Sequence, residues 1–164
     1  MMRLNEQCTL SWGRASSVST EQSIVVADKR RPTDLKRATE RKQKMAKFLI
    51  HITTGPSDPT KPTLGCLIAA TALKKGNKVN VFIAGDGVHL FGPDSLSTTE
   101  GLGIGKLSDI VASINEGGGQ FYLSGRSAQA RGYDEAILKG HRAEFAMPDK
   151  LVELASEADT VLCY

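Results

Sequence analysis

The chain has 164 residues, which is enough for one domain with a sizeable core and short for two. No apolar run approaches the ~20 residues that cross a bilayer, which excludes a membrane span. The formal net charge is +3, but residues 1–44 hold 10 Lys/Arg against 5 Asp/Glu, whereas residues 45–164 hold 11 against 13. Residues 45–164 are therefore slightly acidic and lack the excess of positive charge on which nucleic-acid binding depends.

Residues 1–44 show no helical or strand periodicity and end in the charged run "KRRPTDLKRATERKQK". They lack the apolar core of a secretory signal, and their 5 acidic residues argue against an organellar transit peptide. We expect either a disordered extension or sequence upstream of a true start at Met45, followed by one domain over 45–164. The cysteines, Cys8, Cys66 and Cys163, show no metal-ligand spacing. This pattern predicts a reducing, cytoplasmic compartment, with no metal and no cofactor.

From Met45 onward, segments typical of strands alternate with segments typical of helices. The alternation implies βαβ crossovers and a mainly parallel sheet of about five strands. We therefore predict an α/β fold, a three-layer sandwich of the flavodoxin-like or Rossmann-like kind. The expected strands are 47–53, 78–85, 120–125, 143–148 and 159–164, and the expected helices are 63–75, 106–115, 127–139 and 149–158.

Such folds bind ligands beyond the carboxyl ends of their strands, near a switch in strand order. This rule brings together three loops, 53–56, 85–89 and 124–127. No loop carries a complete phosphate-binding or dinucleotide motif, and "GLGIG" at 101–105 has the wrong spacing and context. That run is compatible with a flap or a plain linker. The candidate binding residues are Thr54, Gly55, Gly85, Asp86, Gly87, Ser124, Gly125, Ser127 and Arg131.

Several of these residues also have a purely structural interpretation. Asp86 and His89 could form an acid and a base, or Asp86 could simply cap the following helix. His51, inside the first strand, is expected to be packed and hydrogen-bonded. Cys66, in an apolar helix, is expected to be a buried and inert thiol, and Cys163 the same unless the chain end is exposed.

The stretch "FYLSGRSAQARG" carries two serines where a strand turns into a helix. A nucleophilic serine needs an adjacent base, and the GxSxG motif of hydrolases is missing around both Ser124 and Ser127. Ser127 is instead well placed to cap the next helix. Serine hydrolysis would require labelling of Ser124 by a fluorophosphonate probe, which we do not expect.

The chain from Met45 to Tyr164 resembles the DsrE/DsrF-like family, small α/β proteins of sulfur relay that include TusD-like subunits. The resemblance rests on "KFLIHITTGPSDPTKPTLGCLIAATALKKGNKVNVFIAGDGVHLF", "GGGQFYLSGRSAQARGY" and "EADTVLCY". It implies a homo-oligomer, a trimer or hexamer, and a sulfur-relay partner protein. In active members, the resemblance implies a persulfide-carrying cysteine at the end of the third strand, and this position is Ser124 here.

Two functions are compatible with a serine at the position of the family's cysteine. The first is a non-thiol member that binds or assembles with a small anion or a partner protein and is not a stand-alone enzyme. The alternative is a sulfur carrier or sulfurtransferase component. It would use Cys66 or Cys163, or Ser124 would replace a native cysteine.

Overall fold

The computed structural model describes residues 45–164, so the expectations for residues 1–44, Cys8 included, lie outside the described part. Its main feature is a five-stranded sheet in which every neighbouring pair is parallel, in the order β6-β5-β2-β1-β7. The predicted α/β fold with a mainly parallel sheet is confirmed. The strands are β1 (Lys47–Ile52), β2 (Lys78–Ile83), β5 (Gln120–Ser124), β6 (Ala143–Ala146) and β7 (Thr160–Cys163).

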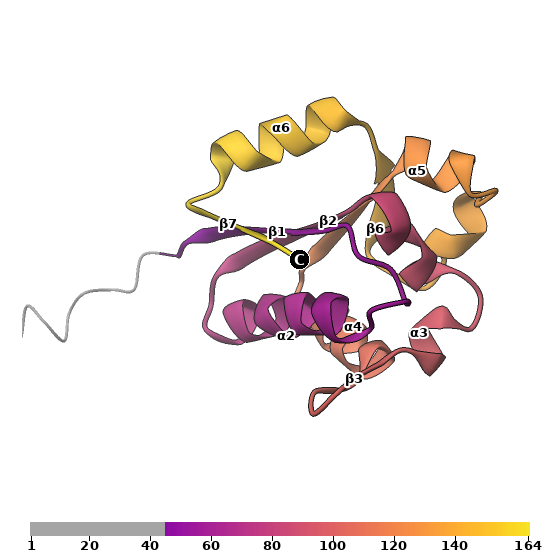
Figure 1. Cartoon of the computed structure of the whole chain (residues 1–164). Helices are drawn as coiled ribbons and strands as arrows, with labels where there is room; N and C mark the ends of the chain where they lie inside the picture. The colour runs from indigo at the N-terminus through magenta and orange to yellow at the C-terminus, as the bar shows by residue number, and fades with distance from the viewer. Residues whose placement is uncertain (1–44) are drawn as a thin grey trace, which may run out of the picture. The chain divides into compact units, whose positions relative to one another are not determined.

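Helices cover both faces of this sheet, as Figure 1 shows, with α2 and α4 on one side and α6 on the other. The inner strands are apolar on both faces, as expected of a sheet buried between two layers. Ile50 and Val81 face the α2 and α4 layer, while Leu49 and Phe82 pack in a smaller cluster with Leu154 of α6. The helices are α2 (Thr60–Lys74), α4 (Leu107–Glu116) and α6 (Pro148–Glu157).

Short elements fill the connections. The glycine-rich run 101–105 forms a two-stranded hairpin that packs on α2, where a Cβ on Gly101 would lie 2.8 Å from the Cβ of Thr63. It therefore belongs to the helical layer and is neither a flap nor a plain linker. The short elements are η1 (Gly85–Phe91), α3 (Ser95–Thr98), β3 (Glu100–Gly101), β4 (Gly105–Lys106), α5 (Gly125–Ala130) and η2 (Glu135–Leu138).

The helix predicted over 127–139 is wrong, because two separate elements occupy this range. Helix α5 starts at Gly125 and ends at Ala130, where Tyr133 N–H donates to the carbonyl of Ala128. Gly132 has a φ of +74°, a left-handed conformation that ends helices and that glycine adopts without strain. The 3₁₀-helix η2 follows, capped by the carboxylate of Asp134.

The first predicted helix begins earlier than expected. It starts at Thr60 instead of residue 63, and Pro59 holds the N-cap position with no side-chain cap. Its end agrees with the sequence, since Gly76 follows it with a φ of +79°. Among residues 45–164, no helix has the length and apolarity needed to cross a membrane.

Candidate functional site

Strands β1, β2 and β5 are neighbours in the sheet, so their following loops meet at one edge. The N–H of Gly85, after β2, donates to the Ser127 hydroxyl of α5 at 3.0 Å, and the N–H of Gly87 donates to the carbonyl of Thr53 at 3.0 Å. The three predicted loops are therefore in contact. The reversal of strand order lies between β1 and β7, so Ser124 at the end of β5 is not at the switch point.

Ser124 is buried at the junction of β5 and α5, with 8% of its surface exposed. Its hydroxyl oxygen accepts hydrogen bonds from the N–H of Ser127 at 3.3 Å and from the Ser127 hydroxyl at 3.1 Å. Ser124 is therefore the N-cap of α5, and the prediction that Ser127 caps this helix is wrong. The reason is that α5 begins directly after the strand, which makes Ser127 the third helical residue, whose N–H the cap receives.

In the described part of the chain, no general base contacts the Ser124 hydroxyl. Within residues 45–164, its side-chain hydrogen bonds involve Ser127 alone. A serine without an adjacent base keeps its proton at neutral pH. The arrangement therefore gives no support to a nucleophilic role for this hydroxyl.

Arg131 joins α5 to the loop after β2. Its guanidinium donates to the carbonyl of Ser127 at 3.1 Å and forms an ion pair with the carboxylate of Asp86. The hydrogen bond and the charge of Arg131 lower the pKa of Asp86 below its ordinary value. Asp86 does not cap η1, whose N-cap is Ala84 without a side-chain bond, because its carboxylate is directed to Arg131.

The glycines of the site let backbone segments approach closely. A Cβ on Gly55 would lie 2.6 Å from the carbonyl oxygen of Asp86, and a Cβ on Gly87 would lie 2.9 Å from that of Ile52. Gly85 has a φ of +56°, which favours glycine. Next to Gly55, Thr54 is half-buried. These glycines position the loops, whereas Ser124, Ser127, Asp86 and Arg131 supply the polar side chains.

Sequence reasoning missed Tyr133, which lies in the turn after α5. Its hydroxyl is 2.8 Å from Nδ1 of His89, and the two rings meet edge to face at 5.6 Å. This pair is a second tie between η1 and the segment after α5, beside the pair of Asp86 and Arg131. The only signal in the sequence was a tyrosine two residues beyond Arg131, in a turn.

The two cysteines of the described part differ sharply. Cys66 is buried, as predicted, and burial raises the pKa of its thiol to about 12. Cys163 is exposed in β7, next to His51 of β1 in the parallel register. The Nε2 atom of His51 is buried without a partner among residues 45–164, contrary to the expected hydrogen bond, and burial lowers the pKa of this imidazole.

No group of three or more His, Cys, Asp or Glu side chains in the described part is arranged to hold a metal ion. The site is thus built from two hydroxyls, one ion pair and backbone N–H groups. Such groups can bind an anion or a hydrogen-bonding partner.

Two solved structures share the fold of this chain. The crystal structure of the ychN protein from E. coli has a TM-score of 0.59 at 17% identity, covering 73% of this chain and 100% of that one. A conserved protein of unknown function from Bacteroides thetaiotaomicron, BT1422, has a TM-score of 0.53 at 15% identity, covering 73% and 95%. None of the curated proteins matches the chain in sequence. Residues 46–164 match the DsrE/DsrF-like family, and the chain belongs to that family.

Proposed function

We propose that this chain is a non-thiol member of its family, which binds a small anion or a partner protein reversibly and carries no sulfane sulfur at this site. The observation behind the proposal is the place of Ser124. It ends β5, caps α5 and lies where the family resemblance implies a persulfide cysteine.

The surroundings of Ser124 would favour a thiolate. A sulfur atom at this position would receive the N–H and O–H of Ser127 at the start of α5. Hydrogen-bond donors at a helix N-terminus lower a thiol pKa towards neutrality. A serine hydroxyl ionises too weakly to respond in the same way, and it forms no persulfide. The site therefore keeps the binding groups and lacks the sulfur acceptor.

Reversible anion binding also agrees with the exposed ion pair that Arg131 forms. Its only carboxylate partner in the described part is Asp86, whose side chain is 70% exposed. Exposed ion pairs contribute little to stability because water and salt screen them. An incoming anion can therefore replace Asp86 at the guanidinium, while the hydrogen bond of Arg131 to the Ser127 carbonyl keeps the side chain in place.

The test is intact-mass and peptide mass spectrometry after incubation with a persulfide donor. We expect the Ser124→Cys variant to gain one sulfur atom on residue 124, whereas the unaltered chain gains none on any cysteine. Ser156→Cys, at an exposed position of α6, is the matched control for the general reactivity of an added thiol. A stable persulfide on the unaltered chain would refute the non-thiol proposal.

A sulfur carrier that uses Cys163 is the second candidate. It is favoured by the exposure of Cys163 and by its neighbour His51, a half-buried imidazole that burial keeps in its neutral form. Cys66 is a poor alternative because its thiol is buried. Alkylation of the native protein decides this question. If iodoacetamide leaves Cys163 unmodified, the second candidate fails.

We further propose a cytoplasmic homo-oligomer, a trimer or hexamer, that engages a sulfur-relay partner protein. Three leucines on the side of α2 and the β3–β4 hairpin support an apolar contact surface. Leu64 is 38% exposed, Leu67 37% and Leu102, at the hairpin tip, 88%. Light scattering of the purified chain should give three or six times the chain mass, and a monomer at micromolar concentration would contradict this.

A further inference from the structure

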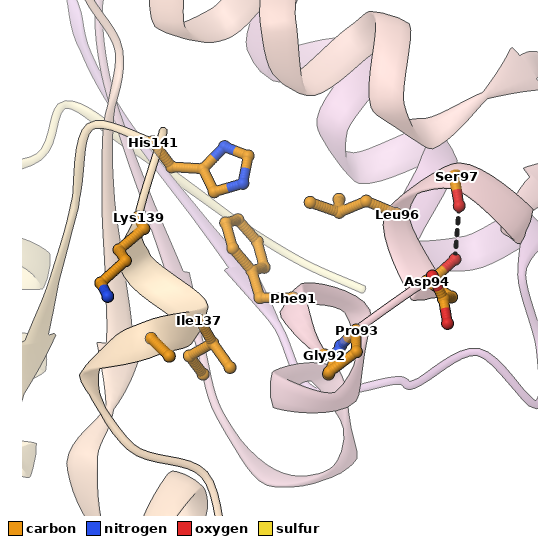
Figure 2. A pocket seen from close by; sticks show the side chains of 10 residues that line it. Phe91, Gly92, Pro93, Asp94, Leu96, Ser97, Ile137, Lys139 and His141 are labelled. Carbon is orange, nitrogen blue, oxygen red and sulfur yellow. Dashed lines mark hydrogen bonds between the residues drawn. The ribbon is translucent and has the colours of Figure 1, made fainter.

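A cavity of about 340 Å³ lies between the end of η1, helix α3 and the segment around η2 (Figure 2). This volume falls in the range of sites for small ligands. The same 3₁₀-helix, η1, begins at the Ser124 site with Gly85 and ends at the cavity with Phe91. The lining residues are Phe91, Gly92, Pro93, Asp94, Leu96, Ser97, Ala136, Ile137, Lys139 and His141.

One part of the cavity is apolar. Phe91 is 5% exposed and Ile137 8% exposed, and both belong to the core that holds the fold together. The half-buried Leu96 packs against the same core and faces Phe91 across the cavity in Figure 2. Buried and fixed apolar groups of this kind favour the hydrocarbon part of a ligand, since its transfer from water is favourable.

A hydrogen-bond donor faces this apolar part. The amide oxygen of Asn115 accepts from the N–H of Arg142 at 3.1 Å, so its NH₂ group is the one that lies 3.4 Å from Nδ1 of His141. Nδ1 is then the acceptor, and the neutral ring carries its proton on Nε2. Figure 2 shows the second ring nitrogen directed towards Leu96 and the cavity.

The ring of His141 is held in this position. It meets the ring of Phe91 edge to face, with centroids 5.2 Å apart. Burial lowers the pKa of His141, so the neutral form with Nε2–H predominates at neutral pH. A fixed N–H at the wall of an apolar cavity is the arrangement that orients a ligand with one polar end.

The wall opposite His141 is conformationally strained. Asp94 is the only residue other than glycine with positive φ among residues 45–164, at +65°. Its carbonyl accepts hydrogen bonds from the hydroxyls of Ser97 and Thr98, both at 2.8 Å, which hold α3 against this turn. Conformations of this kind are costly and concentrate at ligand sites. Here the turn places Leu96 at the cavity.

The charges at the cavity lie on two sides. Lys139 is on the same side as His141, with its ammonium group directed away from the His141 ring, and Asp94 is across the cavity from them (Figure 2). Lys139 forms no ion pair with any residue of the described part. The side of His141 thus offers a hydrogen-bond donor, and the exposed side chain of Lys139 adds a positive charge at the rim of the cavity.

We propose that this cavity binds a small apolar carboxylate. The carboxylate accepts a hydrogen bond from Nε2–H of His141, with the charge of Lys139 at the rim, and the hydrocarbon part lies against Phe91, Leu96 and Ile137. This site is separate from Ser124 and does not depend on the function proposed for it.

The test is an NMR titration of the ¹⁵N-labelled full chain at neutral pH with benzoate and with its uncharged ester, methyl benzoate. We expect saturable shifts of the amides of Phe91, Gly92, Ile137 and His141. Benzoate should bind at least about tenfold more tightly than the ester, since the charge-assisted hydrogen bond is stronger than a neutral one. For a ligand of this size, a dissociation constant of roughly 1 mM is expected.

Three variants locate the binding. Lys139→Gln should weaken benzoate several-fold and leave the ester unchanged, whereas Leu96→Trp, which fills the cavity, should abolish the binding of both. Lys75→Gln, at an exposed lysine after α2, is the matched control and should change neither.

The unaltered chain alone can overturn the proposal. It fails if benzoate at millimolar concentration shifts the NMR signal of no cavity amide. It also fails if the shifts cluster at Arg131 and Gly85 instead. Equal affinity for benzoate and its ester would refute the carboxylate preference.

Discussion

Gly55 offers the sharpest test of how the candidate site is built. In the Gly55→Ala variant, the added methyl group would lie 2.6 Å from the carbonyl oxygen of Asp86 and 3.1 Å from its carbonyl carbon. Both atoms are backbone, so one loop must move away from the other. Overpacking of this kind costs about 1–3 kcal/mol of unfolding free energy. A shift of Asp86 would also disturb its ion pair with Arg131.

Urea denaturation and thermal melting measure this effect. For a chain of this size, each kcal/mol lowers the melting temperature by about 2–4 °C. Gly125→Ala is the matched control in the same site, because its Cβ would meet no atom closer than 3.8 Å. This variant removes a glycine from a helix, so its free energy of unfolding should rise by about 0.5–1 kcal/mol or stay unchanged. If Gly55→Ala is as stable as Gly125→Ala, the close approach of the two loops is refuted.

Two further predictions concern the polar groups of the site. Ser124→Ala removes the cap of α5 and should cost about 0.5–2 kcal/mol in urea denaturation, whereas an unchanged midpoint would show that the cap contributes nothing. Arg131→Gln should raise the pKa of Asp86 towards its ordinary value, because the hydrogen bond and charge that lower it are lost. The contribution of this ion pair is present above the ordinary carboxylate pKa and is lost as the pH falls through the lowered value. A ¹³C-carboxylate titration that gives equal Asp86 pKa values in both proteins would contradict the pairing.

Much of the fold follows from local patterns. The apolar runs "KFLIHI" and "KVNVFI" are too short for helices and apolar on both faces, which predicts strands of a buried parallel sheet. Gly76 marks the end of the first helix because it can adopt positive φ. Patterns of this kind act over a few residues, so the sequence displays them directly.

The helix after β5 shows where local patterns fail. Both Ser124 and Ser127 are good capping residues, and the sequence does not say which one precedes the first helical turn. The structure selects Ser124, because the chain enters the helix directly from the end of β5. As the cap, the Ser124 oxygen accepts two hydrogen bonds from Ser127, which sets the polar surroundings of this position.

By itself, the sequence determined the alternation of strands and helices, the three loops at one edge of the sheet and the serine at position 124. Only the tertiary structure decided the pairs that complete the site. Arg131 and Asp86 are 45 residues apart, and Tyr133 and His89 are 44 apart. They meet because β2 and β5 are neighbours in the sheet, although η1, α3, the β3–β4 hairpin and α4 separate these strands along the chain. No local pattern encodes that neighbourhood, which is set by how the whole core packs.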